Sequence, residues 1–569
     1  MFYLYAALFV ALSPWTLKAD HCPICLANFH DRSGAPVIVK TQCCGQRFDL
    51  DCLSMCFVDQ PIGARRCAMC RQNPMPVVNQ NTSESHPDTF FPDQTFYLAC
   101  FNGDLEQVER SLAEGVNVNA VMIGGFTALI LASLWGHTEV VEHLINAGAN
   151  PDTANTLSNN ATALIIAADC GNTLCVKSLI NAGANLNART GGGATPLFMA
   201  AQQNNIDSLK ILIEAGVDLN AQTEDGASPL FAAAARGNTE CLKLLIDAGA
   251  DLNALTKGGA TPLFIAAQRG NNVCMKLLID AGADLNVQTE DGVTPVFIAA
   301  QKNNIDSLKI LIAAEADINA VTKSGANPAF IAAQNGNTDC LIILIEAGAD
   351  QNAATITYGA TPLFTAAQNG NTDCLRILIN AGAGVNAARI TDAATPLFMA
   401  AQNGNTDCVK LLINAGADLN AARINDGATP LFIASQEGNS DCVKLLINAG
   451  ADLNAARIND GATPLFIAAQ EGNSDCVKLL INAGANLNAR VEDGVTSLYI
   501  AAGLGNTDCV KLLIRAGANL NAALPDGTTP LGIATKMGNT DCVKLLTNAG
   551  AEFGTEAEKE TNERRCFAQ

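Results

Sequence analysis

The sequence predicts a mainly α-helical chain in which about fourteen helix–turn–helix repeats stack into a solenoid, preceded by a small zinc-stabilised domain. The first observation behind this prediction is a phrase close to "GATPLFIAAQNGNTDCVKLLINAGADLNA", which recurs from Thr127 onward and has a weaker copy near Thr95. It recurs at steps of 33 or 34 residues, after one initial step of 35. The second observation is a group of eight cysteines between residues 20 and 73, which includes two C-x-x-C pairs.

Each repeat contains the signals of two short helices separated by a turn. In the repeat that begins at Thr395, threonine is suited to cap the first helix and Pro396 to occupy its first position, where no N–H is needed. The second helix begins at "TDCVKLLI", where we expect Cys408, Leu411 and Leu412 to share a buried face. A glycine in "NAGA" ends this helix, and a loop with turn residues leads to the next repeat. Two helices of this length cannot bury their apolar faces alone, so the repeats are expected to stack.

The repeats resemble the ankyrin repeat over residues 95–552, because the period and the elements "TPL", "AA", "LL" and "AGA" match in order. Ankyrin repeats bind other proteins through their concave face and loop tips, so the resemblance implies protein partners. One departure is systematic. Where the family usually has histidine after "TPL", this chain mostly has phenylalanine, which predicts that packing replaces a polar contact. Examples are Phe198, Phe231, Phe264 and Phe432.

Candidate contact residues are those that differ between repeats on an otherwise constant frame. At the loop tips they are Glu224, Asp225, Lys257, Gly258, Lys323, Ser324, Tyr358, Arg389 and Asn425. After "AAQ" in the first helix they are Gln203, Arg269, Lys302, Asn369 and Glu471. A solvated surface that is free to drift explains the variation at any single position equally well, so both interpretations stay open.

The charge distribution disfavours nucleic acid as a partner. The whole chain carries a formal net charge of −21, whereas residues 20–73 contain five Asp and six Lys or Arg. The acidity therefore belongs to the repeats, and an acidic surface repels phosphates. A basic protein partner is compatible with it. The sequence contains no H-E-x-x-H, phosphate-loop or G-x-S-x-G motif, so no catalytic residue is predicted.

Ten of the 21 cysteines hold the same position in the second helix of their repeats. They are Cys175, Cys241, Cys274, Cys340, Cys374, Cys408, Cys442, Cys476, Cys509 and Cys542. A disulfide needs Cα atoms within roughly 7 Å, closer than equivalent positions of successive repeats are expected to lie. We interpret these cysteines as small core residues, and so many thiols favour a reducing compartment such as the cytosol.

Residues 1–19 contain an apolar run that resembles a secretory signal or a short membrane anchor. The run is interrupted by Pro14 and lacks a basic segment before it, so a wrongly assigned start or a buried flank explains it equally well. A signal peptide would direct secretion, whereas the thiols favour the cytosol or the cytosolic face of a membrane. The sequence leaves the choice open.

Residues 20–73 carry a cysteine spacing that is typical of zinc sites, because each C-x-x-C presents two thiolates to one tetrahedral ion. The cysteines are Cys22, Cys25, Cys43, Cys44, Cys52, Cys56, Cys67 and Cys70. Their arrangement resembles a RING finger, whose eight ligands hold two zinc ions in a cross-brace. The resemblance implies two zinc ions here.

Two of the eight ligand positions of the family are exchanged in this chain, where Gln46 and Asp49 replace His or Cys. Asp49 can bind zinc through its carboxylate, whereas Gln46 is a weak ligand that Cys43 can replace. The resemblance then assigns Cys22, Cys25, Asp49 and Cys52 to the first ion, and Cys43, Cys44, Cys67 and Cys70 to the second. The alternative is a degenerate finger that binds one ion or none, with His21 and His30 as further candidate ligands.

RING fingers of the ubiquitin system dock a ubiquitin-conjugating enzyme and position its thioester for attack by a substrate lysine. The resemblance implies this docking role for Ile24, inside the first C-x-x-C, and for Arg71, after the last cysteine. Cys56, Ala68 and Met69 depart from the docking surface of the family. Two functions therefore stay open. One is a RING-type ubiquitin ligase whose repeats bind substrate, and the other is a non-enzymatic ankyrin scaffold with a structural zinc module.

The segments that flank the repeats differ from them in composition. Residues 74–94 are rich in Pro, Asn and Ser and are expected to form a linker. Residues 553–569 form a charged tail that ends in "CFAQ", which fits a C-a-a-X box and makes Cys566 a candidate for farnesylation and membrane association. Ankyrin repeats, a ubiquitin-system module and a prenylation box together resemble the effectors that intracellular bacteria deliver into eukaryotic hosts, which implies the host cytosol as the site of action.

Overall fold

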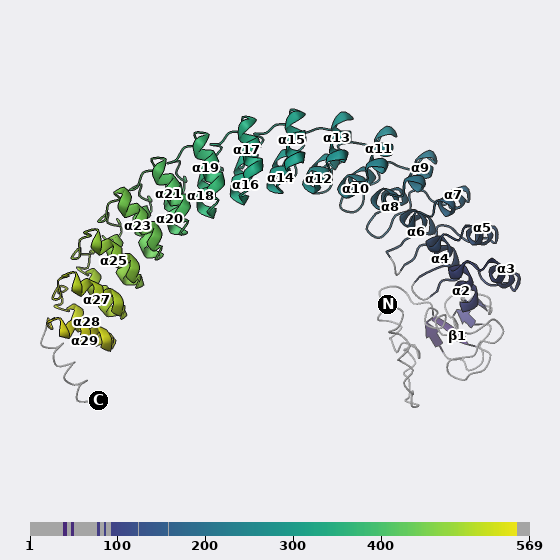
Figure 1. Cartoon of the computed structure of the whole chain (residues 1–569). Coiled ribbons are helices and arrows are strands. Elements are labelled where there is room, and N and C mark those ends of the chain that lie inside the picture. Colours follow the sequence, from purple (N-terminus) through teal and green to yellow (C-terminus); the bar gives the residue numbers. More distant parts are fainter. Residues whose placement is uncertain are drawn as a thin grey trace. The chain divides into compact units, whose positions relative to one another are not determined.

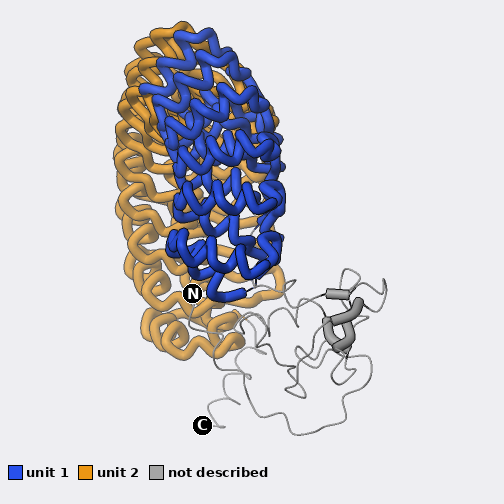
Figure 2. Tube along the Cα trace, turned by 90° about the vertical axis from the view of Figure 1, so that its right-hand side faces the viewer, with its two compact units in different colours: residues 1–266, 273–284 blue, residues 267–272, 285–569 orange. Residues whose placement is uncertain are grey.

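The computed structural model describes residues 93–122, 125–156 and 159–554, together with the backbone of four short strands nearer the N-terminus. The chain divides into two compact parts, coloured differently in Figure 2. The first part comprises residues 1–266 and 273–284, and the second comprises residues 267–272 and 285–569. We describe each part by itself.

The four strands form one antiparallel sheet in the order β2-β1-β3-β4. They are β1 (Ile38–Thr41), β2 (Arg47–Asp49), β3 (Val77–Asn79) and β4 (Ser85–His86). The Cα of Val39 in β1 lies opposite Phe48 in β2 and Asn79 in β3. Strands β3 and β4 fall inside residues 74–94, the segment for which the sequence predicted a linker.

The described part of the chain contains 28 helices, which form the fourteen helix pairs that the sequence period predicted (Figure 1). The first helices of the pairs are α2 (Gln94–Asn102), α4 (Ala128–Trp135), α6 (Ala163–Cys170), α8 (Pro196–Gln203), α10 (Pro229–Arg236), α12 (Pro262–Arg269), α14 (Pro295–Gln301), α16 (Pro328–Asn335), α18 (Pro362–Asn369), α20 (Pro396–Gln402), α22 (Pro430–Gln436), α24 (Pro464–Glu471), α26 (Ser497–Leu504) and α28 (Pro530–Met537). The second helices are α3 (Leu105–Ala113), α5 (Thr138–Asn146), α7 (Thr173–Asn181), α9 (Ile206–Glu214), α11 (Thr239–Asp247), α13 (Asn272–Asp280), α15 (Ile305–Ala313), α17 (Thr338–Glu346), α19 (Thr372–Asn380), α21 (Thr406–Asn414), α23 (Ser440–Ala449), α25 (Ser474–Asn482), α27 (Thr507–Arg515) and α29 (Thr540–Asn548).

The first helix of a repeat begins as the sequence predicts. At α20, the hydroxyl of Thr395 accepts a hydrogen bond from the N–H of Phe398 at 3.2 Å, which caps the helix. Pro396 occupies the first helical position. Leu397 and the alanines of "LFMAA" are fully buried, so this helix forms the centre of each repeat.

The second helix buries a slightly different set of residues from the predicted one. In α21, Cys408, Val409 and Leu412 are buried, whereas Leu411 is only partly buried, so the prediction for Leu411 was wrong. Successive residues of an α-helix point about 100° apart. Cys408, Leu412 and Val409 therefore fall within one arc, and Leu411 lies beyond its edge. The arc is wide because α21 packs against α20 and also against α19 and α23.

Side-chain hydrogen bonds tie each repeat to the one before it. The amide nitrogen of Asn405, just before α21, donates to the carbonyls of Ala367 and Gln368 at the end of α18. In the loop that follows α21, the N–H of Asp418 donates to the side-chain oxygen of Asn386 in the repeat before it, at 2.9 Å. Equivalent bonds recur through both parts, so the repeats are held by polar contacts as well as by apolar packing.

The ten cysteines of the second helices are buried and free, as predicted for core residues. Several lie close to a threonine of the preceding repeat, as Cys408 does to the hydroxyl of Thr372 at 3.6 Å. Burial raises the pKa of these thiols, for example to about 11 at Cys241 and Cys340. They therefore stay protonated near neutral pH and act as small apolar residues.

Candidate protein-binding site

The loop tips form a continuous hydrogen-bonded row within each part. In the second part, the N–H of one residue at each tip donates to a carbonyl of the tip before it. The donors are Lys323, Ile356, Ile390, Ile424, Ile458 and Glu492, and the N–O distances are 2.7–3.0 Å. In the first part, Glu224 and Lys257 make the same bond. Each tip is therefore fixed relative to its neighbours, which presents side chains in a constant register.

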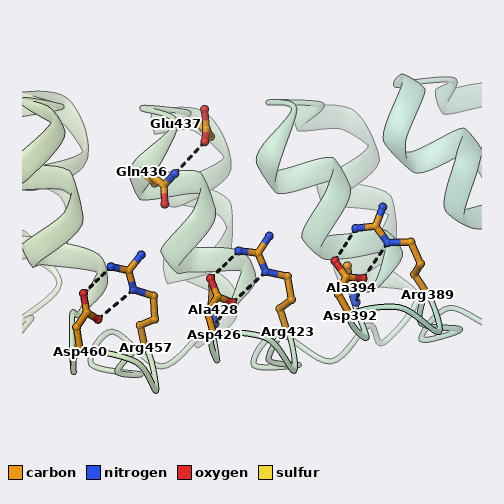
Figure 3. Close-up of polar contacts among 10 residues, drawn as sticks. All are labelled: Arg389, Asp392, Ala394, Arg423, Asp426, Ala428, Gln436, Glu437, Arg457 and Asp460. Carbon is orange, nitrogen blue, oxygen red and sulfur yellow. Dashed lines mark hydrogen bonds and ion pairs between the residues drawn. The ribbon is translucent and has the colours of Figure 1, made fainter. Parts of the chain in front are cut away.

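Three successive tips of the second part are closed by an ion pair within the loop (Figure 3). The guanidinium Nε donates to the carboxylate Oδ1 of an aspartate three residues further on, at 2.8 Å, 2.9 Å and 3.0 Å, and Nη2 donates to the second oxygen. The pairs are Arg389–Asp392, Arg423–Asp426 and Arg457–Asp460. The same carboxylate accepts the N–H of the residue two positions on, for example Ala428. The aspartate thus links the arginine to the start of the next repeat.

The ion pairs explain part of the phenylalanine pattern. Each arginine lies over the ring of the phenylalanine in the first helix of its own repeat, with the guanidinium carbon 5.2–5.7 Å from the ring centre. The pairs are Arg389 with Phe364, Arg423 with Phe398, and Arg457 with Phe432. The predicted packing role is confirmed at Phe198, Phe264 and Phe432, which are buried, whereas Phe231 is only partly buried.

The pKa values of these groups favour the charged pair. The hydrogen bond from arginine lowers the pKa of Asp392, Asp426 and Asp460 below its usual value, while the reciprocal bond raises the pKa of each arginine. Each pair is therefore ionised but carries no net charge. These tips are electrically neutral, although the chain as a whole is acidic.

The exposed large apolar side chains at these three tips and at the tip before them include one isoleucine each. Ile356, Ile390, Ile424 and Ile458, which we call the isoleucine row, are 68–72% exposed. The tip residues predicted from the sequence, among them Tyr358, Arg389 and Asn425, do not include this row. Tyr358 is 56% exposed, but Arg389 is held by Asp392 and is not free to contact a partner. The repeated letters "ARI", spaced by 34 residues, were the signal that could have found three of the four isoleucines.

The variable positions of the first helices are exposed but partly engaged. The side chain of Gln203 donates to Asp169 at 3.0 Å, and that of Asn369 donates to the carbonyl of Gln334 at 2.9 Å. Both bonds join neighbouring repeats. Of the two predicted sets of contact residues, the loop tips therefore offer more unengaged surface than these two positions do.

The predicted zinc, docking and lipid-attachment residues lie outside the described residues, apart from the backbone of Asp49. They are Cys22, Cys25, Cys43, Cys44, Cys52, Cys67 and Cys70 for zinc, Ile24 and Arg71 for docking, and Cys566 for lipid. Asp49 ends β2, where its Cα pairs with that of Ile38. Among the described residues, no group of three or more His, Cys, Asp or Glu could hold a metal ion. No helix of the described ranges has the length and apolar character needed to cross a membrane.

Comparison with protein families identifies the repeats. The family model described as "Ankyrin repeats (3 copies)" matches residues 68–155, 95–190, 144–223, 197–289, 263–355, 296–389, 351–423, 397–491 and 465–557. No curated protein matches the chain. The family matches overlap, cover most of the sequence and include all fourteen helix pairs. The chain therefore belongs to the ankyrin-repeat family.

Proposed function

We propose that this protein binds a substrate protein on its ankyrin repeats and presents it to a ubiquitin-conjugating enzyme docked on the N-terminal cysteine-rich segment. Ankyrin repeats in general bind protein partners, and the described repeats offer a surface for this role. The finer part of the proposal, ligase function, rests on the resemblance of residues 20–73 to a RING finger.

The observation that carries the binding role is the row of loop tips in the second part. Backbone hydrogen bonds fix the tips in register, while the side chains of the isoleucine row remain exposed. A fixed backbone with exposed apolar side chains loses little conformational entropy when a partner binds. Exposed apolar side chains gathered in one row, as opposed to scattered singly, are typical of interaction sites.

The ligand chemistry of the cysteine-rich segment supports zinc binding. Seven cysteine thiolates and the Asp49 carboxylate supply two sets of four donors of the types that zinc prefers. The metal would fix the segment as a small rigid platform, on which Ile24 and Arg71 contact the conjugating enzyme and ubiquitin. No covalent step on this chain is required, because the platform acts by positioning.

A discharge assay with the full-length protein tests the ligase role. Purified, zinc-loaded protein is mixed with a panel of ubiquitin-charged conjugating enzymes, and loss of the thioester is followed over time. We expect at least one enzyme to discharge faster, and Ile24→Ala to remove the acceleration. The matched control is Leu174→Lys, which alters only an exposed residue of α7 and should leave discharge unchanged. Metal analysis of the same preparation should give about two zinc ions per chain.

A non-enzymatic scaffold is the second candidate. It is favoured by Gln46 at a ligand position and by Ala68 and Met69 in the last C-x-x-C, where the family places a proline-containing sequence. If the protein binds zinc but accelerates discharge from none of the conjugating enzymes in the panel, the scaffold function is the correct one.

We further propose a cytosolic, reducing location and lipid attachment at Cys566. The many free thiols of the repeats support the location, because proteins of oxidising compartments usually pair their cysteines in disulfides. If Cys566 is farnesylated, Cys566→Ser should move the protein from membranes to the soluble fraction of cells that express it. Equal partitioning of the variant and the parent would reject the lipid.

A further inference from the structure

The isoleucine row occupies one structural position in four successive repeats of the second part. The same position carries charged residues on either side of the row, Lys323 before Ile356 and Glu492 after Ile458. In the first part it is held by Glu224 and Lys257. Among the described residues that donate this hydrogen bond, isoleucine is therefore confined to four successive repeats.

The fold does not require isoleucine at this position. Lys323 makes the same backbone hydrogen bond to the preceding tip, at 2.9 Å, as Ile390 does at 2.8 Å. Some isoleucines lie beside the glycine of the tip before them, as Ile390 does at Gly359 and Ile458 at Gly427. This contact still leaves about seven-tenths of each side chain in water. The row thus exposes apolar surface that the loop itself does not use.

The spacing of the row matches one kind of secondary structure. Packed helices lie about 8–10 Å apart, so equivalent positions in successive repeats are separated by roughly that distance. Seven residues of an α-helix advance about 10.5 Å and return to the same face. Three residues of a strand advance about 10 Å, but they turn the side chain to the opposite face. An α-helix with one apolar residue per heptad can therefore meet every tip of the row, whereas a strand meets only alternate tips.

The charges at the two ends of the row determine which charged residues the partner needs at its own ends. Within the row, the arginines are neutralised by their aspartates, so the partner needs no charge there. Lys323 at one end favours a carboxylate and Glu492 at the other favours a cation. A helix that carries an acidic residue one heptad before its apolar series and a basic residue one heptad after it satisfies both ends.

We propose that the isoleucine row binds an amphipathic helix with one apolar residue in each of four successive heptads, flanked by an acidic and a basic residue at the same heptad position. The proposal rests on the partner-binding role of the repeats and specifies the class of partner. A polyproline II segment repeats every three residues, or about 9.3 Å, but such segments dock in grooves lined by aromatic rings. The row is aliphatic, which favours packing against leucine or isoleucine of a helix.

Synthetic peptides test the proposal directly with the full-length protein. The probe is a fluorescent alanine-rich helix of six heptads, with Glu in the first, Leu in the middle four and Lys in the last, all at one heptad position. A second peptide of the same composition spaces these residues by eight, which rotates them around the helix. A third replaces the terminal Glu and Lys by Gln, and a fourth is a polyproline peptide with Leu at every third position. Fluorescence anisotropy measures the Kd of each peptide.

We expect the heptad peptide to bind at least tenfold more tightly than the eight-residue and polyproline peptides, and severalfold more tightly than the Gln peptide. The double variant Ile390→Lys/Ile424→Lys should weaken binding of the heptad peptide at least tenfold. Lysine is compatible with the fold at this position, because Lys257 and Lys323 already occupy it in other repeats. The matched control is Leu174→Lys, which removes an equally exposed leucine on α7 of the first part and should change the Kd less than twofold.

Equal affinity of the heptad and eight-residue peptides, tighter binding of the polyproline peptide, or unchanged binding by the double variant would each overturn the proposal. The assay contains no conjugating enzyme, so its outcome is separate from that of the ligase. Discharge activity without peptide binding rejects the helix partner alone, whereas peptide binding without discharge rejects the ligase role alone.

Discussion

The loops of the 33-residue repeats and those of the 34-residue repeats are closed by different side chains, which accept a hydrogen bond from the N–H near the end of the loop. In the loop of residues 223–227, the hydroxyl of Thr223 accepts the N–H of Ala227 at 3.1 Å. In the loop of residues 423–428, which is one residue longer, Asp426 accepts the N–H of Ala428 at 3.2 Å and binds Arg423. The residue that accepts this N–H is therefore the first of the shorter loop and the fourth of the longer one.

A third loop shows that the added residue does not by itself require the arginine–aspartate pair. The loop of residues 355–360 also has the extra residue, yet the hydroxyl of Thr355 still accepts the N–H of Ala360 at 3.0 Å. The longer loop therefore does not need the ion pair in order to close. The pair replaces a neutral hydroxyl by a charged bridge that also covers the phenylalanine ring below it. In this chain, the length of a loop and the type of side chain that closes it therefore vary independently.

The largest expected effect comes from removing the carboxylate of the longer loop. Asp426→Ala leaves the Arg423 guanidinium and the Ala428 N–H without their acceptor in a half-buried site, which should cost about 2 kcal/mol. Asp225→Ala in the shorter loop is the matched control, because Thr223 closes that loop, and it should cost about 0.5 kcal/mol or less. Urea unfolding, with hydrogen exchange of the two loops as a local readout, measures both. Equal costs at the two sites would show that the ion pair contributes nothing beyond the hydroxyl.

A methyl group at the glycine of the longer loop should have the next largest effect. Gly427 has a φ of +74°, and a Cβ added there would lie 2.5 Å from Cγ1 of Ile458. Gly427→Ala should therefore cost about 1.5 kcal/mol for the backbone conformation, plus the cost of displacing Ile458. Gly461→Ala is the control, since its φ is +73° and its nearest neighbour would be 3.7 Å away. The difference between the two unfolding free energies isolates the Ile458 contact, and a difference near zero would show that this side chain moves freely.

Acid should weaken the loops that contain an arginine–aspartate pair and spare those that a threonine hydroxyl closes. The pKa values of Asp392, Asp426 and Asp460 lie below the usual 3.8 because each accepts hydrogen bonds from arginine. A carboxyl whose folded pKa is lowered stabilises the folded state fully above its unfolded pKa, and this stabilisation is lost as pH falls below about 4. The hydroxyl of Thr223 does not titrate in this range.

Hydrogen exchange between pH 5 and pH 2.5, corrected for intrinsic exchange rates, follows this difference. Protection should fall in residues 423–428 and persist in residues 223–227. A parallel loss in both loops would mean that acid acts through general charge repulsion rather than through the ion pairs.

The sequence predicted the frame of the repeats more fully than their surface. Threonine caps, the proline after them and the cysteine position follow from local rules, and these features were confirmed in most of the repeats. Burial of Val409 in place of Leu411 was missed, because it depends on contacts from two neighbouring repeats. The pairing of Arg423 with Asp426 was missed for a similar reason, since "ARINDG" reads as a polar turn until the loop geometry is known. The zinc ligands, the docking residues and the lipid site stay predictions.

The smallest expected effect comes from relieving strain at Ala393, the one longer loop in which alanine replaces the glycine. Ala393 has a φ of +56°, a conformation in which a Cβ costs roughly 1–2 kcal/mol. Ala393→Gly removes this strain but adds freedom to the unfolded chain, so we expect a net stabilisation of only about 0.5 kcal/mol. The same substitution at Ala394, which follows it and is buried, removes a packed methyl group and should destabilise instead. Urea midpoints that move in opposite directions for the two variants would show that backbone conformation, rather than loss of a methyl group, sets the sign at position 393.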